Sequence, residues 1–436
     1  MLFANIDILD ENLDHKRGMF VGTEGSHITY VGAEEPVDTA RFGERYDGTG
    51  KLLMSAFYNT HAHTPMTLLR GYAENQPLQQ WLNDTVWPFE GKMDMEKKHH
   101  YWGCMLSQAE MLRYGVVGYT DMYFATIDRC EATLEAGMKA NHCDGGTMCF
   151  VETDYDTLPV AAVNEQLFAE YQNAGDGRVK IDMCVHGEYT TPQGMIERCV
   201  AEAKAHDTGL HIHLAETKLE CDECKERHDG MTPAAWFDHL GAFDIPVTAA
   251  HCVWVESSDI ELMAAKGVNV SLNPASNMKL ASGIAPVARL LEWGANVGIG
   301  TDGPSSNNDL DMWDEMRTGS FLQKVATGDP CVLPAYEVLR MATTRAADAI
   351  GMKGEIGVLA EGARADLIVL NLDKPHLTPC HDLVANLVYC AKPSDVETVM
   401  VDGRIVVRQG ALANGDFGAI RREVERRLGV LQRRGE

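Results

Sequence analysis

The sequence has no apolar run that approaches the roughly 18 consecutive residues of a membrane-spanning helix. Its first ten residues also carry acid where the start of a secretory leader would be basic. We therefore expect a cytoplasmic protein with no membrane partner.

Positive charge is scarce as well. The chain has 38 Lys and Arg against 64 Asp and Glu, which gives a formal net charge of −26. Such a surface repels nucleic-acid phosphates, so we expect no nucleic-acid partner. Arginines do gather near the C-terminus, but Glu423 and Glu425 interrupt them. An apolar stripe at helical spacing predicts a docked terminal helix there, and its members are Ile420, Val424, Leu428 and Leu431.

Two further patterns are missing. The 12 cysteines have no regular spacing, which fits free thiols in a reducing compartment better than disulfides. No repeat with a period of 20 to 50 residues is present, which argues against solenoids and propellers. With 436 residues, 45% of them hydrophobic, the chain can still bury a large core and add a smaller domain.

Short apolar runs rich in β-branched residues alternate with segments of helical periodicity. Eight such runs predict an α/β fold closed into a (β/α)8 barrel over residues 55–355. Residues 1–54 and 356–436 instead have short strands with tight turns, and we expect them to form one composite β-sandwich with a C-terminal helix. The eight runs are Leu52–His63, Val116–Tyr123, Gly146–Glu152, Val179–His186, Leu210–Glu216, Val247–Val253, Val268–Asn273 and Val297–Asp302.

Nearly every run ends in polar residues, which should converge on one face because barrel active sites form at the carboxyl ends of the strands. These residues are His61, His63, Asp121, Glu152, His186, His213, Glu216, His251, Asn273 and Asp302.

His61 and His63 are separated by one residue, so on a strand both side chains point to the same face. Alone, the pair fits a hydrogen-bonded strand end as well as a metal site. His213 and Asp302, at the ends of two other runs, complete three imidazoles and a carboxylate, a set suited to zinc or iron(II). Such an ion lowers the pKa of a bound water toward neutrality, and this predicts a hydrolase.

Glu216 follows His213 by three residues, where its carboxyl group could move a proton to or from the reacting groups. His251, at the end of the sixth run, could polarise the nucleophile or the substrate. A solvated loop carboxylate is the alternative for Glu216.

With these residues the chain resembles the amidohydrolase superfamily, and within it the methylthioadenosine/S-adenosylhomocysteine deaminases. The resemblance spans nearly the whole chain, and its motifs begin at Asn59, Trp87, His213, Ala250, Asn273 and Gly300. It implies that His61, His63, His213 and Asp302 bind one divalent ion, with Glu216 as proton shuttle, His251 as the water-polarising histidine, and Glu90 and His186 as nucleoside contacts.

The resemblance further implies the reaction. Asp302 and His251 would help to deprotonate the water that attacks C6 of the purine, Glu216 would protonate N1, and Asp302 would pass its proton to the departing amine. The products would be ammonia and an inosine analogue. The ion would be Zn²⁺ or Fe²⁺, and it would be single, because the fourth run ends in His186 rather than in the lysine that bridges two metals in some relatives. We expect a homo-oligomer.

The chain departs from the family around the third run. Family members that accept S-adenosylhomocysteine place arginines there to bind the carboxylate of the substrate, but no arginine occurs between Arg129 and Arg178. We therefore expect 5′-deoxyadenosine, methylthioadenosine or adenosine as substrate in preference to S-adenosylhomocysteine.

Two alternatives stay open. Relatives of similar sequence deaminate or dechlorinate free bases such as guanine, oxidised guanine, cytosine or triazines, and a ribose-binding Glu90 would argue against them. A non-enzymatic scaffold is the other, against which the complete ligand set argues.

Overall fold

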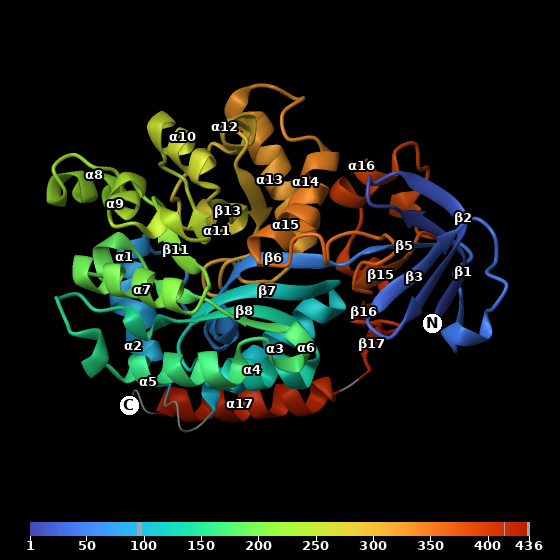
Figure 1. The fold of residues 1–436 in the computed structure, drawn as a ribbon, viewed down its shortest axis with the longest axis horizontal. Coiled ribbons are helices and arrows are strands. Elements are labelled where there is room, and N and C mark those ends of the chain that lie inside the picture. Colours follow the sequence, from blue (N-terminus) through green and yellow to red (C-terminus); the bar gives the residue numbers. More distant parts are fainter. Residues whose placement is uncertain (94–97, 414, 434–436) are drawn as a thin grey trace.

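A computed structural model describes residues 1–93, 98–413 and 415–433. In Figure 1 the strands of both chain ends lie together on one side, and the parallel strands with most helices form the rest of the molecule. No helix within these ranges is long and apolar enough to cross a membrane.

Strands from both ends of the chain share one nine-stranded sheet. β5 joins the two halves, because it pairs with β1 in parallel and with β15 in antiparallel register. The strands are β1 (Leu2–Leu9), β2 (His15–Glu24), β3 (His27–Gly32), β4 (Arg45–Asp47), β5 (Lys51–Ser55), β15 (Leu367–Asn371), β16 (Val396–Val401), β17 (Arg404–Arg408) and β18 (Ala411–Leu412). The run that begins at Leu52 is therefore two strands, and its first half belongs to this sheet.

Nine parallel strands form two further sheets, in chain order. The first holds β6 (Phe57–Ala62), β7 (Val116–Tyr123), β8 (Lys139–Asp144) and β9 (Val179–Ile181), and the second holds β10 (Met183–Val185), β11 (Leu210–Leu214), β12 (Val247–His251), β13 (Asn269–Leu272) and β14 (Asn296–Ile299). The fourth run is split at Asp182, whose N–H donates to His142 O in β8 at 2.9 Å. On the other side, Ala62 pairs in parallel with Asp302, so the two sheets adjoin at both edges.

The third strand differs from the prediction. It is β8, and the predicted run Gly146–Glu152 contains only a short 3-10 turn (Gly145–Thr147). β8 carries polar residues that distant segments bury: Lys139 Nζ lies 2.7 Å from carboxylate oxygens of both Asp366 and Asp402. The strand has no apolar signature, because four of its six residues are polar or charged. Glu152 consequently lies exposed in a loop rather than at a strand end.

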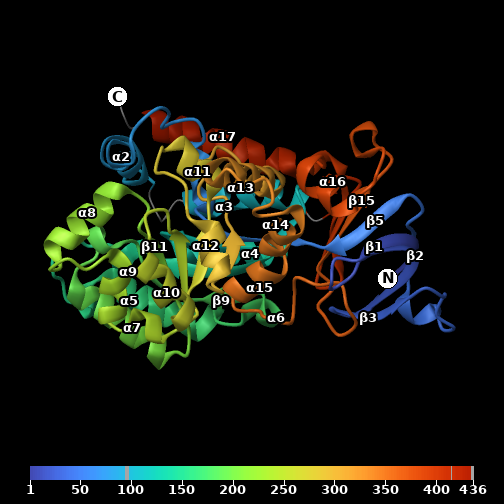
Figure 2. The ribbon, with the colours of Figure 1, turned by 90° about the horizontal axis from the view of Figure 1, so that it is seen from above.

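Helices cover the outside of the parallel strands (Figures 1 and 2). The C-terminal helix α17 packs on α3, with Ile420, Val424 and Leu431 buried, so the predicted terminal helix is confirmed. The longer helices are α3 (His99–Arg113), α4 (Thr126–Ala136), α5 (Pro159–Gln166), α7 (Gln193–Ala205), α8 (Lys218–Arg227), α10 (Ser257–Lys266), α13 (Met312–Thr327), α14 (Ala335–Ala342) and α17 (Phe417–Arg433). The shorter ones are α1 (Leu78–Gln80), α2 (Trp87–Glu90), α6 (Ala174–Gly177), α9 (Pro233–His239), α11 (Pro274–Lys279), α12 (Val287–Glu292), α15 (Thr344–Ala349) and α16 (Leu383–Tyr389).

Candidate metal centre and substrate pocket

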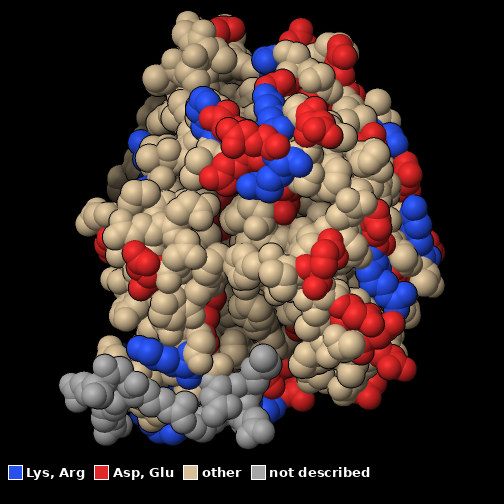
Figure 3. Space-filling view, turned by 90° about the vertical axis from the view of Figure 1, so that its left-hand side faces the viewer, with Lys and Arg blue, Asp and Glu red and all other residues tan. Residues whose placement is uncertain are grey.

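Five candidate side chains meet at the carboxyl ends of four parallel strands. His61 lies in β6 and His63 directly after it, His213 and His251 lie in β11 and β12, and Asp302 follows β14. All five are buried. Figure 3 looks onto this end of the molecule and shows a hollow near its middle, bordered mostly by residues that are neither basic nor acidic.

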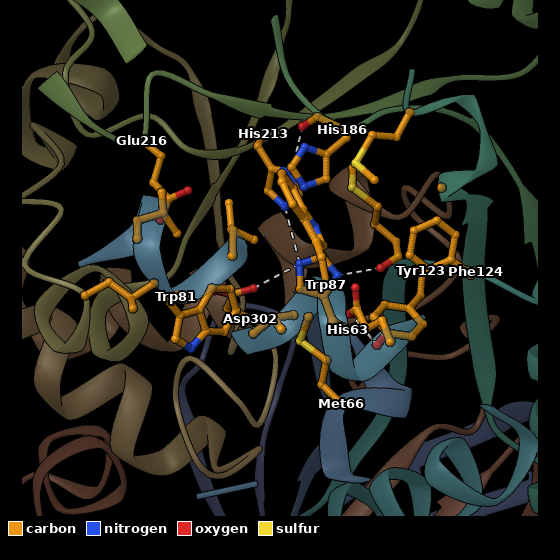
Figure 4. A pocket seen from close by; sticks show the side chains of 18 of the residues that line it. His63, Met66, Trp81, Trp87, Tyr123, Phe124, His186, His213, Glu216 and Asp302 are labelled. Carbon is orange, nitrogen blue, oxygen red and sulfur yellow. Dashed lines mark hydrogen bonds and ion pairs between the residues drawn. The ribbon is translucent and has the colours of Figure 1, made fainter. Parts of the chain in front are cut away.

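The donor atoms of these residues lie within reach of one ion. His63 Nε2 is 3.2 Å from Asp302 Oδ1 and 3.3 Å from His213 Nε2, and His61 Nε2 is 3.3 Å from the same Asp302 oxygen. Ligands held about 2.0–2.1 Å from a tetrahedral zinc are separated by roughly 3.3 Å, so these distances fit. Figure 4 shows His63, His213 and Asp302 converging on one point.

The Nδ1 atoms of His63 and His213 bind backbone carbonyl groups, so that their Nε2 atoms are directed at a common cation position. His63 Nδ1 hydrogen-bonds to Met122 O, and His213 Nδ1 donates to His186 O at 2.6 Å. A carbonyl only accepts, so in the neutral rings both Nε2 atoms carry lone pairs. A metal ion between the two Nε2 atoms would satisfy both lone pairs.

Burial keeps the rings of His61 and His213 neutral, whereas for His63 burial is outweighed by the hydrogen bond and charge of Asp302, which raise its pKa. Desolvation lowers the pKa of His61 to about 4 and, together with the neighbouring His186, holds the pKa of His213 well below its usual value. Burial would raise the pKa of Asp302, but hydrogen bonds from His61 and His63 outweigh it and hold that pKa well below its usual value. Neutral imidazoles and an ionised carboxylate are the protonation states that bind metal.

The protein fixes the orientation of the set. Asp302 Oδ2 accepts from Ser276 Oγ at 2.6 Å and from Ser306 Oγ at 2.7 Å, which leaves Oδ1 for the ion. His251 and Asp302 both have left-handed backbone, with φ of +73° and +60°. Residues other than glycine rarely adopt this region except where surrounding structure holds them, often at functional sites.

Glu216 lies just beyond β11 and its carboxyl group enters the same pocket (Figure 4). Its Oε1 accepts from Ser282 Oγ at 3.2 Å, and its Oε2 is 3.9 Å from His251 Nε2. Burial raises the pKa of Glu216. A carboxyl group that holds its proton more readily than usual fits a proton donor.

Glu90 and His186 line the pocket as well. Glu90, the last residue of α2, accepts from Tyr123 Oη at 2.5 Å, and burial raises the pKa of Glu90 to about 7 although this hydrogen bond opposes the rise. His186 follows β10, and its Nδ1 lies 3.0 Å from Thr190 Oγ1. Burial lowers the pKa of His186 to about 3, so its ring is neutral.

The rest of the pocket is apolar and aromatic. The cavity and the solvent-filled space at its mouth together have a volume of about 670 Å³. No Lys or Arg is found among its lining residues in the described part of the chain. The side chains that form the apolar wall are Met66, Leu78, Trp81, Leu82, Val86, Trp87, Met122, Phe124, Met148 and Leu280.

The sequence interpretation missed several residues of the site. Tyr123 ends the predicted second run and could have been found by its position, but Ser276, Ser282 and Ser306 lie in loops and short helices where nothing marks a serine as special. His211 is buried with Nε2 2.8 Å from His61 Nδ1, and its i, i+2 spacing from His213 was the available signal.

Comparisons with known proteins agree with this arrangement. The model of the amidohydrolase family matches residues 52–406. A 5-methylthioadenosine/S-adenosylhomocysteine deaminase of Desulforamulus reducens is 42% identical over 409 residues, 94% of this chain and 93% of that protein. A 5′-deoxyadenosine deaminase of Methanothermobacter thermautotrophicus is 42% identical over 368 residues, 84% of each chain. A solved adenosine deaminase from Xanthomonas campestris with bound zinc has a TM-score of 0.91 at 29% identity, with 99% of this chain and 98% of that one covered.

Proposed function

Because the chain belongs to the amidohydrolase family, we propose that it hydrolyses the 6-amino group of an adenosine-type nucleoside to give an inosine analogue and ammonia. The observation that carries this proposal is one pocket in which a metal-ligand cluster, a proton donor and Glu90 lie together. The names of the three proteins compared above support it, since each is called a deaminase of adenosine or of an adenosine derivative.

The ion would be held by His61, His63, His213 and Asp302, and we propose a single ion, Zn²⁺ or Fe²⁺. Zinc bound in the Xanthomonas structure supports the former. Lys180, the lysine of the fourth run, lies near the start of that run with its Nζ 2.6 Å from Asn173 Oδ1, which supports a single ion. When bound, such an ion lowers the pKa of a water molecule and so supplies the nucleophile.

The chain's own residues would move the protons. We assign to Asp302 and His251 the removal of a proton from the attacking water. Glu216 would donate its proton to N1 of the purine ring, which relieves the negative charge that develops as C6 is attacked. Asp302 would then pass its proton to the departing amine, so that ammonia leaves.

Glu90 and His186 would bind the nucleoside. The Glu90 carboxylate would accept hydrogen bonds from the two ribose hydroxyls, with Tyr123 holding it in place, and His186 would contribute a neutral ring as a further contact. The pocket wall without Lys or Arg favours a small or uncharged 5′ group. We therefore propose 5′-deoxyadenosine, methylthioadenosine or adenosine as substrate.

We propose that the two parallel sheets close into a (β/α)8 barrel over residues 55–355. The pairing of Ala62 with Asp302 and the bond from Asp182 to β8 support closure at both edges. Residues 1–54 and 356–436 would form the composite β-sandwich, and an apolar core between strands of both chain ends, which includes Phe3, Ile6, Leu53 and Val369, supports a separate domain. The homo-oligomer stays a prediction.

An ammonia-release screen of metal-replete protein tests the proposal. Nucleosides, free bases and triazines are offered at equal concentration, chloride release is followed as well for chlorinated triazines, and kcat/KM is measured for each. We expect the nucleosides to be turned over fastest. A higher kcat/KM for guanine, cytosine or a triazine would replace the nucleoside by a free base as substrate.

A further inference from the structure

The turn that carries Glu216 is held by a carboxylate from the following helix. Glu220 is the third residue of α8, and only 4% of its surface is exposed. Its Oε1 accepts the backbone N–H of Ala215 at 2.9 Å, and its Oε2 accepts those of Glu216 at 2.8 Å and Thr217 at 3.4 Å.

Capping of helix α8 requires only one of these three hydrogen bonds, the one from the N–H of Thr217. Thr217 is the N-cap residue, and its hydroxyl accepts the N–H of Glu220 at 3.2 Å, so the two residues form a capping box. The two shorter bonds go to Ala215 and Glu216, which precede the helix. The carboxylate of Glu220 is therefore directed at the turn between β11 and α8 rather than at the helix end.

This turn has backbone geometry that needs external support. Ala215 has a φ of +50°, which is unfavourable for alanine and persists only where neighbouring groups hold it. Its carbonyl oxygen accepts the N–H of Trp254 at 2.9 Å, so the turn is held from both sides. The direction of the Glu216 side chain depends on this backbone.

Burying Glu220 so close to Glu216 is unfavourable. Burial and the charge of the Glu216 carboxyl group raise the pKa of Glu220 to about 7. A cap for α8 alone does not need a second carboxyl group at this position, because glutamine also serves at this place in a capping box.

We propose that Glu220 is a positioning residue, which holds the turn from Ala215 to Thr217 so that the Glu216 carboxyl group faces the reacting ring. Glu220 is not among the described residues that line the pocket. The inference rests on the proposed function, in which Glu216 carries the proton.

The variant Glu220→Gln keeps the shape of the side chain but places an NH2 group against one of the backbone N–H donors. A displacement of a reacting group by about 1 Å can cost 100-fold in rate, so we expect kcat for 5′-deoxyadenosine to fall about 10- to 100-fold. KM should stay within about two-fold of the wild type, since the nucleoside contacts are intact.

Asp259→Asn is the matched control. Asp259 is the third residue of α10, is 3% exposed, and accepts the N–H of Glu256 at 2.8 Å in a capping box of its own. This variant should lower Tm and leave kcat unchanged. If Glu220→Gln lowers Tm to the same extent and keeps wild-type kcat, Glu220 is only a helix cap and the proposal is overturned. Should Glu220→Gln fail to fold, Glu220→Asp takes its place, with the same expectation and the same overturning result.

A double-mutant cycle separates this inference from the proposed function. If Glu220 acts through Glu216, adding Glu220→Gln to Glu216→Gln should change kcat by less than about two-fold. A loss in that background as large as in the wild type overturns the positioning role. A wild-type kcat in the single variant Glu216→Gln would overturn the proposed role of Glu216. If Glu216→Gln lowers kcat but Glu220→Gln keeps the wild-type kcat, only the inference about Glu220 is overturned.

Discussion

We expect methylthioadenosine to be deaminated with a kcat/KM at least about ten-fold higher than that of S-adenosylhomocysteine, because none of the described residues that line the pocket is an arginine that could bind the carboxylate of the latter. Arg129 is fully buried and donates to Asp121, Tyr123 O and Cys143 O. Arg198 pairs with Asp156 and Glu202.

The magnitude follows from the contact that is missing. A hydrogen bond to a charged group contributes about 1.5–3 kcal/mol. Since about 1.36 kcal/mol corresponds to a factor of ten in rate, one missing arginine predicts a loss of roughly 10- to 150-fold in kcat/KM. The acidic residues Glu152, Asp154 and Asp156 in the loop after β8 would add repulsion.

Ammonia release from the two nucleosides at concentrations below KM gives the ratio directly. Met148 lines the pocket, so Met148→Arg should raise the efficiency with S-adenosylhomocysteine relative to methylthioadenosine. Met148→Gln is the control, because it adds polarity of similar length without charge and should leave the ratio unchanged. Equal or higher kcat/KM for S-adenosylhomocysteine in the wild type would refute the reasoning.

Three further predictions concern the site and its support. Glu90→Ala should reduce kcat/KM for nucleosides by about 10-fold or more, since the ribose hydroxyls lose a charged acceptor, and steady-state kinetics that show no loss would remove Glu90 from the site. Glu216→Gln should lower kcat by about 10²–10⁴-fold, the usual contribution of a general acid, at unchanged metal content. Arg129→Met leaves the Asp121 carboxylate buried without its partner at 2.8 Å, so the free energy of unfolding should fall by about 3–5 kcal/mol in urea denaturation. A loss below about 1 kcal/mol would contradict that account of the pair.

The meeting of the candidate ligands could be predicted from the sequence. The second run has the same bounds as β7, Val116–Tyr123, and the side chains at the ends of the first, fifth, sixth and eighth runs lie together as expected. Apolar runs with β-branched residues mark buried parallel strands, and parallel strands bring their carboxyl ends to one edge. Position in the chain was therefore enough to place these side chains.

The third strand could not be predicted, for two physical reasons. β8 is polar, and Asp366 and Asp402, more than 200 residues away, neutralise its buried Lys139. The segment after it is apolar but exposed: Phe150, 60% exposed, packs edge-on against the Trp87 ring at 5.6 Å, beside the pocket. The pattern of apolar and polar residues in a segment therefore does not show whether residues far away in the sequence bury that segment.

The residues that hold the catalytic side chains in place could not be predicted from the sequence either. Ser282 contacts Glu216 from a loop 66 residues away, and Glu220 appears as one more acidic residue in a charged helix. The spacing of Thr217 and Glu220 indicates a capping box, but no spacing rule gives the bonds of Glu220 to the N–H groups of Ala215 and Glu216 or that of Ser282 to Glu216.

Metal titration of the stripped protein tests the central claim most directly. The protein is freed of metal with a chelator and Zn²⁺ is added back in steps, while bound metal and ammonia release from 5′-deoxyadenosine are measured together. We predict that activity is absent without metal and rises linearly to a plateau at about one ion per chain. Full activity in the metal-free protein, or metal-replete protein that releases no ammonia from any adenosine-type nucleoside, would contradict the account.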